Sequence, residues 1–125
     1  MTPARWLLDS NIAIYLLQGN APHALARLNR CPLGSVVTSS ICLGEMLIGL
    51  RPNEQAGLQP LLSVIGVEPF DEAAARIYAT LPFRRASYDR LIAAHALSRN
   101  LTVITANAPD FADVPGLAVE DWMQP

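Results

Sequence analysis

Residues 6–17 read WLLDSNIAIYLL, a short apolar run that ends in an aspartate and passes directly into an apolar segment with helical spacing. The run Trp6–Leu8 predicts a buried strand that ends at Asp9. The segment Asn11–Leu17 predicts a helix. A buried strand followed at once by a helix is the opening of a βαβ unit, and such units build parallel sheets.

The rest of the chain repeats this alternation of strands and helices. We expect further strands at residues 35–38, 64–68, 101–105 and 117–119, and further helices at residues 41–50, 53–62, 71–81 and 87–99, with one more helix that Asn20 caps and that has Pro22 in its first turn. The pattern predicts the α/β class, with a mainly parallel sheet covered by helices on both faces. No repeat, linker or charge run divides the chain, so we expect one domain over residues 1–125.

The composition narrows the possible functions. Hydrophobic residues make up 51% of the 125 residues and charged residues 16%, which excludes intrinsic disorder and suggests an apolar surface that a partner covers. All nine basic residues are arginine, so enzymes that need a lysine, such as receiver domains and phosphate-loop enzymes, are excluded. The net charge of −2 provides no overall basic field for nucleic acid.

Cysteine usage and hydropathy indicate the compartment. Cys31 and Cys42 lack zinc-site spacing, and we expect free thiols in a reducing compartment. No apolar run reaches the length of a membrane span, and the N-terminal segment lacks the features of a signal peptide. We therefore expect a cytoplasmic protein without a membrane partner.

Glu45 is the most informative single residue. It is the only charged residue in the predicted helix 41–50, and it shares a face with Ile41 and Ile48. A carboxylate on a buried face costs several kcal/mol unless it has a partner, which favours a functional role. The alternative is that Glu45 is exposed and only increases solubility.

Three more acidic residues follow predicted strands or begin a predicted helix. Asp9 follows the first strand, Asp89 lies in the first turn of the helix 87–99, and Asp110 follows the strand 101–105. Each has an ordinary structural explanation, namely a helix cap for Asp9, a favourable helix dipole for Asp89 and a turn for Asp110. In parallel sheets, however, ligands bind beyond the carboxyl ends of the strands, where we expect these residues to meet.

Four acidic side chains at one sheet edge would repel one another unless a cation lies among them. Oxygen ligands without histidine or cysteine suit Mg²⁺ or Mn²⁺ rather than zinc. Such ions bind phosphate oxygens and activate water for attack on a phosphodiester. His95 has no acid at helical spacing, so we expect a packed or partly exposed histidine rather than a metal ligand.

Four segments carry a resemblance to a known family: LLDSNIAIYLL (7–17), SSICLGEMLIGL (39–50), YDRLIAAHALSRNLTVITAN (88–107) and DFADVPGLAVEDW (110–122). They resemble PIN-domain ribonucleases of the VapC toxin type, and the likeness runs from Leu7 to Trp122. It implies a three-layer α/β/α sandwich in which acidic residues hold Mg²⁺ or Mn²⁺ for endonucleolytic cleavage of RNA. It also implies a small VapB-like antitoxin as partner, a homodimer and a toxin–antitoxin hetero-oligomer.

The resemblance assigns roles to individual residues. The family's metal-binding acids match Asp9, Glu45, Asp89 and Asp110. The positions that orient these ligands through hydrogen bonds match Ser10, Asn11, Thr105 and Asn107. Some relatives carry another acidic residue at the position of Asn107, so the fourth metal-binding acid of this chain is Asp110 alone.

Three arginines bracket Asp89: Arg84, Arg85 and Arg90. They are candidates for bidentate contacts to RNA phosphates, and a solvated loop and helix start is the alternative explanation. The segment between Leu81 and Asp89 is shorter than in the usual toxin, so the resemblance does not transfer substrate choice.

The residues and the resemblance together predict a metal-dependent endoribonuclease. The alternative is a metal-stabilised protein-binding module without nuclease activity, which the apolar composition also supports. Loss of cleavage in an Asp9→Asn variant would discriminate between the two.

Overall fold

A five-stranded parallel sheet forms the centre of the protein. The computed structural model describes residues 3–82 and 87–125. The strands are β1 (Trp6–Leu8), β2 (Val36–Ser39), β3 (Gly66–Glu68), β4 (Thr102–Ile104) and β5 (Val119–Glu120). Their order is β3-β2-β1-β4-β5, and every neighbouring pair is parallel. The chain builds outward from β1 to β3 and then returns to place β4 on the other side of β1, so the strand order reverses between β1 and β4.

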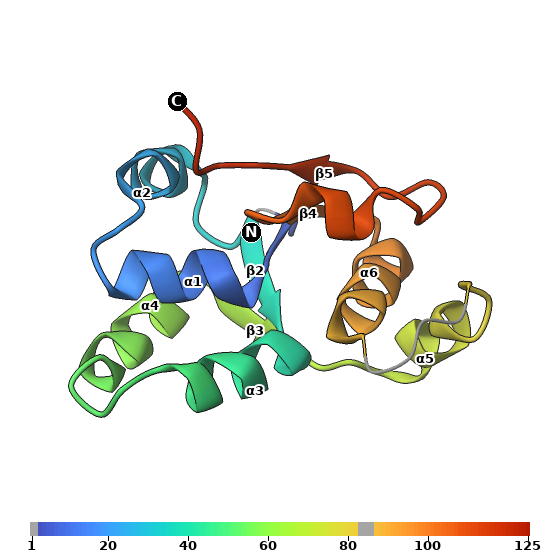
Figure 1. Cartoon of the computed structure of the whole chain (residues 1–125), viewed down its shortest axis with the longest axis horizontal. Helices are drawn as coiled ribbons and strands as arrows, with labels where there is room; N and C mark the ends of the chain where they lie inside the picture. The colour runs from blue at the N-terminus through green and yellow to red at the C-terminus, as the bar shows by residue number, and fades with distance from the viewer. Residues whose placement is uncertain (1–2, 83–86) are drawn as a thin grey trace.

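Helices cover both faces of the sheet. They are α1 (Ser10–Leu17), α2 (Pro22–Arg30), α3 (Ser40–Gly49), α4 (Leu58–Val64), α5 (Glu72–Tyr78) and α6 (Tyr88–Arg99), with short 3₁₀ turns η1 (Gln55–Gly57) and η2 (Ala108–Phe111). Figure 1 shows α1 to α4 on one side of the sheet and α5 with α6 on the other. The expected three-layer α/β/α sandwich on a parallel sheet is confirmed.

Several details of the expected elements are wrong. The predicted strand 64–68 begins only at Gly66, and the predicted strand 117–119 overlaps β5 only at Val119. The N-cap of α2 is Ala21, not Asn20, and it makes no side-chain capping bond, although Pro22 does begin the helix. The predicted helix 53–62 is instead the turn η1 followed by α4, which continues to Val64. Pro60 falls in the first turn of α4, where its missing N–H costs no hydrogen bond, so it is compatible with the start of a helix.

The middle of the sheet forms the core. Leu7 and Leu8 of β1 and Val103 and Ile104 of β4 are completely buried. Strands that lie between two layers of helices are buried on both faces, which is why these segments are apolar without interruption. Asp9 and Thr105 follow these two strands directly, so the packing of β1 against β4 fixes where both side chains begin.

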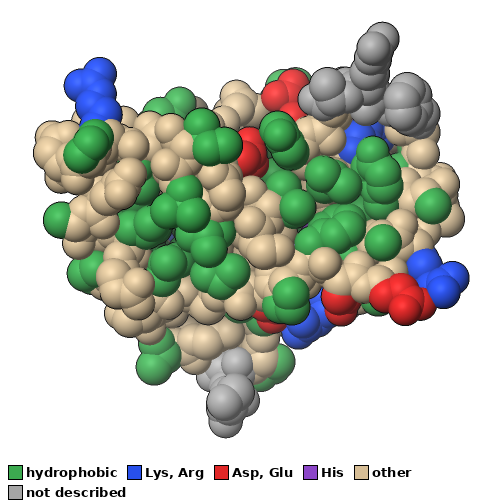
Figure 2. Space-filling model, turned by 90° about the horizontal axis from the view of Figure 1, so that it is seen from below, with side chains coloured by type: hydrophobic (Ala, Val, Ile, Leu, Met, Phe, Trp, Pro, Cys, Tyr) green, Lys and Arg blue, Asp and Glu red, His purple; other side chains and the backbone are tan. Residues whose placement is uncertain are grey.

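Apolar residues also remain on the surface. Figure 2 shows hydrophobic side chains gathered on the face that carries α3 and α5. On α3, Leu47 is 51% and Ile48 87% exposed. Within the part of the chain that the structure describes, no helix is long and apolar enough to cross a membrane.

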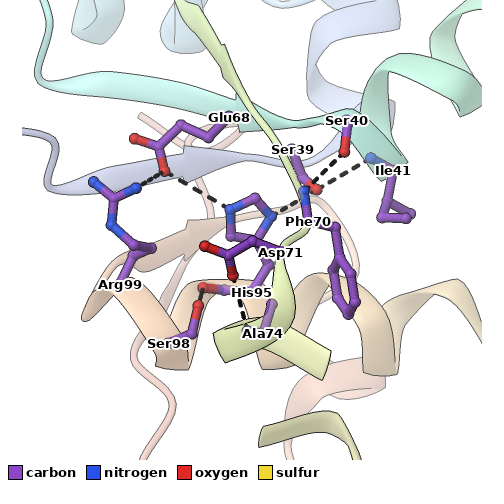
Figure 3. Close-up of polar contacts among 10 residues, drawn as sticks. All are labelled: Ser39, Ser40, Ile41, Glu68, Phe70, Asp71, Ala74, His95, Ser98 and Arg99. Atoms are coloured by element: carbon purple, nitrogen blue, oxygen red, sulfur yellow. Dashed lines mark hydrogen bonds and ion pairs between the residues drawn. The ribbon is translucent and has the colours of Figure 1, made fainter. Parts of the chain in front are cut away.

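His95 connects three elements inside the fold (Figure 3). Its Nδ1 lies 2.8 Å from the Ser39 hydroxyl, and its Nε2 lies 3.7 Å from a carboxylate oxygen of Glu68. The ring meets Phe70 edge-on. His95 is 1% exposed, so the expectation of a packed histidine is confirmed. Ser39 accepts a hydrogen bond from the backbone N–H of Ile41 and so caps α3, which links His95 to the helix that carries Glu45.

His95 should make the stability of the protein depend on pH. Burial lowers the pKa of His95 from its usual 6.5, while the charges of Glu68 and Asp71 partly oppose this effect. The unfolded chain therefore takes up the proton first as the pH falls below 6.5, and stability that is present above this pH is lost. We predict that the free energy of unfolding falls more steeply between pH 7.5 and 5.5 in the wild type than in His95→Gln, by at most about 1.4 kcal/mol per pH unit.

Urea unfolding at several pH values measures these slopes. The matched control is His23→Gln, which changes an exposed histidine of α2 in the same way and should keep the wild-type slope. Equal slopes in the wild type and His95→Gln would contradict the prediction.

Candidate active site

Asp9 lies at the carboxyl end of β1, at the point where the strand order reverses. It is 3% exposed, and its Oδ1 accepts a hydrogen bond of 2.8 Å from the backbone N–H of Ser10. Its Oδ2 accepts a bond of 2.8 Å from the hydroxyl of Thr105. Asp9 is therefore the N-cap of α1, which is the ordinary structural role for an aspartate at this position. Its carboxylate is at the same time fixed in position beside the end of β4.

Glu45 reaches the same place from helix α3. The Ser10 hydroxyl lies 3.1 Å from Oε1 of Glu45 and 3.5 Å from Oδ1 of Asp9, with the shorter contact made to Glu45. Carboxylate oxygens of Asp9 and Glu45 and the sulfur of Cys42 lie within 4.8 Å of one another. Two acids that are 36 positions apart in the chain are thus close enough to share a cation.

The two other predicted acids act on this pair through their charge. Burial is the main cause that raises the pKa of Asp9, hydrogen bonds from Thr105 and Ser10 oppose it, and the negative charge of Asp110 adds to it. Burial likewise raises the pKa of Glu45, and the charges of Asp9 and Asp89 raise it further. The site therefore concentrates negative charge, and a cation would relieve it.

Cys42 is a member of this cluster that the sequence did not reveal. It was expected as a buried free thiol, which the structure confirms, but not as a neighbour of the acids. Burial raises its pKa to about 12, so the thiol keeps its proton. The donors left for a cation are carboxylate oxygens, which suit a hard divalent ion. The spacing of three residues between Cys42 and Glu45 on one helix was the available signal.

The residues predicted to orient the acids have unequal contacts. Ser10 and Thr105 bond directly to Asp9. Asn107 is exposed, and its backbone N–H donates to the hydroxyl of Thr105 while its carbonyl accepts from the N–H of Asp110. Asn11 lies half-buried in the first turn of α1. Asp110 therefore sits on a turn that begins at Thr105.

The predicted arginine contacts need a correction. Arg90 is 3% exposed, and its buried guanidinium forms an ion pair with Asp113, whose own side chain is exposed. A buried guanidinium that is paired internally does not face the solvent, so Arg90 does not fit the predicted contact with RNA phosphates. Arg84 and Arg85 lie outside the described residues.

Comparisons with known proteins agree with this fold. The PIN domain model matches residues 6–117. A protein of Shigella flexneri named tRNA(fMet)-specific endonuclease VapC is 32% identical, over 94% of this chain and 98% of its own length. The DNA-bound VapBC structure of Salmonella typhimurium contains a chain with 30% identity and a TM-score of 0.83, covering 95% of this chain and 98% of that one.

A second DNA-bound complex, VapBC2 of Rickettsia felis, contains a chain with 25% identity and a TM-score of 0.80, covering 97% of this chain and 99% of that one. The fold thus agrees with a match that extends over nearly the whole sequence. The chain belongs to the PIN-domain family and, within it, to the VapC proteins.

Proposed function

We propose that this protein is an endoribonuclease that depends on Mg²⁺ or Mn²⁺ and that acts as the toxin of a toxin–antitoxin pair. The observation that carries the proposal is the buried carboxylate of Asp9, which lies beside Glu45 at the reversal of the strand order. A buried negative charge next to another acid is unfavourable on its own and becomes favourable around a cation. Asp9 and Glu45, joined by Asp89 and Asp110, would hold the ion.

Neighbouring residues would hold the metal-binding carboxylates in place. Thr105 and Ser10 hold the two oxygens of Asp9 in a fixed orientation, so the carboxylate need not reorganise when the site is filled. The Ser10 hydroxyl also donates to Glu45 and so links the two acidic side chains. A bound divalent ion would activate water and offset the charge of the phosphate and of the departing oxygen.

RNA is the substrate class that the relatives favour. The Shigella flexneri relative is named for a tRNA, and the relative from Rickettsia felis is named ribonuclease. A tRNA pool is therefore the first substrate to test. The free thiols Cys31 and Cys42 fit a cytoplasmic place of action.

An antitoxin and a second copy of the chain are the proposed protein partners. Several structural relatives are described as VapBC complexes. In this chain a pocket of about 260 Å³ beside the acidic site is lined by Ile41, Ile48, Tyr88 and Glu45, among others. Its apolar walls and acidic end fit a segment that presents apolar side chains and a cation. The same surface would serve the alternative function, a binding module without nuclease activity.

The first prediction from this proposal concerns the acids. Asp9→Asn and Asp89→Asn should each lower RNA cleavage by a factor of about 100 or more, because each removes a charged ligand oxygen from the ion. Initial rates on a tRNA pool with Mg²⁺ or Mn²⁺ measure the effect, and circular dichroism checks the fold. Glu72→Gln, which changes an exposed acid of α5, should keep the wild-type rate. A well-folded double variant that still cleaves RNA would contradict the site assignment.

The second prediction concerns stability without metal. Because burial raises the pKa of Asp9, ionised Asp9 costs stability once the pH exceeds this pKa, whereas the cost is absent below the usual value of 3.8. Asp9→Asn is neutral and keeps the helix cap. At pH 7.5 in EDTA its melting temperature should exceed that of the wild type by about 3–5 °C, and the difference should narrow at pH 4.5.

Thermal melts with added Mn²⁺ complete this test. The ion should raise the melting temperature of the wild type and leave that of Asp9→Asn unchanged, since binding to the folded state stabilises only a protein that has the site. A wild type that is more stable than the variant at pH 7.5 in EDTA would contradict the prediction.

The third prediction concerns the apolar surface. Ile48→Glu places a charge on the most exposed apolar residue of α3 and should weaken binding of the protein encoded beside this chain, or of a second copy, at least about 10-fold. RNA cleavage by the isolated chain should persist. Leu33→Glu is the matched control, because Leu33 is 75% exposed and lies between α2 and β2. Size-exclusion chromatography and calorimetry measure both, and equal effects of the two changes would refute a role for this surface.

A further inference from the structure

Arg90 occupies an unfavourable place for a cation. It is the third residue of α6, directly after Asp89, and it is 3% exposed. A positive charge in the first turn of a helix is opposed by the helix dipole, and burial adds a desolvation cost. Arg90 therefore depends on a negative partner, and the structure provides Asp113, whose Oδ2 accepts a hydrogen bond from Nη2 of Arg90.

Asp113 belongs to the segment that carries Asp110. The turn η2 spans Ala108–Phe111, and Asp113 follows it by two residues. At its other end this turn is held by Thr105, whose hydroxyl accepts a bond of 3.0 Å from the N–H of Asn107 and donates one of 2.8 Å to Asp9. One end of the turn is thus tied to Asp9, and the other end is tied to the residue that follows Asp89.

Asp110 needs such support because it is exposed on the turn. Phe111 and Val114 are buried and anchor the segment by packing, but apolar contacts alone do not define the direction in which an exposed neighbour points. A hydrogen-bonded ion pair is directional and fixes the segment against α6. The turn is linked to Asp9 through Thr105 and Asn107, and Asp110 bonds back to the carbonyl of Asn107, so the position of the turn sets where Asp110 lies relative to Asp9.

The pair is poorly suited to a role in stability alone. Within the described residues, Nη1 of Arg90 is buried and has no hydrogen-bond partner. A buried guanidinium with incomplete hydrogen bonding, paired with an exposed carboxylate, contributes little net stability compared with an apolar side chain of similar size, because the desolvation of the cation opposes the attraction. Its directional contact is what an apolar replacement would lack.

We propose that Arg90 is a positioning residue: by binding Asp113 it holds the turn η2 against α6, and so keeps Asp110 beside Asp9 in the cation site. This inference rests on the proposed function, because it assigns a role in the same site. Arg90 does not touch the substrate in this proposal and acts through Asp110.

The test compares Arg90→Gln, Asp113→Asn, the double variant and Arg90→Lys with the wild type. Calorimetric titration with Mn²⁺ alone measures affinity. We expect Arg90→Gln and Asp113→Asn each to weaken Mn²⁺ binding about 10-fold, and the double variant to be no weaker than either single one, since all three break the same contact. Arg90→Lys keeps the charge and should recover part of the affinity. The Mg²⁺ concentration for half-maximal cleavage should shift by the same factor, while the rate at saturating Mg²⁺ recovers.

Amide hydrogen exchange provides a readout that does not need metal or RNA. In Arg90→Gln the amides of Ala112 and Val114, which bond within this turn, should exchange faster, whereas the amide of Val103 in β4 should not change. Arg99→Gln changes another arginine of α6, removes its ion pair with Glu68 of β3, and serves as the control. We expect it to change neither the exchange at the turn nor the Mn²⁺ affinity.

The outcomes separate this inference from the proposed function. Unchanged Mn²⁺ affinity or unchanged exchange at Ala112 and Val114 in Arg90→Gln would overturn the role of Arg90, even if the wild type binds Mn²⁺ and cleaves RNA. A lower melting temperature with unchanged metal affinity would likewise overturn it, because that result describes a merely structural contact. A wild type that binds no Mn²⁺ would refute the proposed metal site itself and this inference with it.

Discussion

One constraint organises the candidate site: the carboxylate of Asp9 is buried between the ends of β1 and β4. Burial is unfavourable for a charge, and three groups compensate it: the backbone of Ser10, the hydroxyl of Ser10 and the hydroxyl of Thr105. The sheet places these donors, because Ser10 lies just beyond the end of β1 and Thr105 just beyond the end of its neighbour β4. The strand order reverses between these two strands. The parallel topology therefore brings the first acid and its support together.

The buried acidic groups lower the stability of the folded protein. The pKa of Asp9 and that of Glu45 are both raised, so folding favours the protonated form of these two carboxyl groups, and their ionised form lowers the stability of the folded protein. Functional sites are where such costs persist, because the groups must be ionised to bind a cation. The arginines do not offset this charge through a general basic field. Among the residues that the structure describes, four arginines form ion pairs on the protein itself: Arg27, Arg76, Arg90 and Arg99.

The fold and the proximity of Asp9 and Glu45 could be predicted from the sequence, because both depend on local patterns. Apolar runs that end in polar residues identified β1 and β4, and one charge in an apolar helix identified Glu45. The errors arose where the outcome depends on distant residues. Arg90 beside Asp89 has the pattern of a phosphate clamp, but its guanidinium is buried and pairs with Asp113, which is 23 residues away in the chain. The position of Cys42 beside Asp9 depends on how α3 packs against α1, which no short segment specifies.

Glu45 connects the acidic site with the apolar surface, and this has a consequence for regulation under the proposed function. The residue bonds to Ser10 at the site and also lines the pocket with Ile41, Ile48 and Tyr88. A protein segment that fills this pocket would cover Glu45, and a cationic side chain on that segment would meet the same carboxylates that hold the metal ion. Substrate binding and partner binding would then exclude each other without any conformational change, because both need the one face of α3 that carries Glu45. A partner bound to this face of α3 would therefore inhibit the enzyme by covering Glu45.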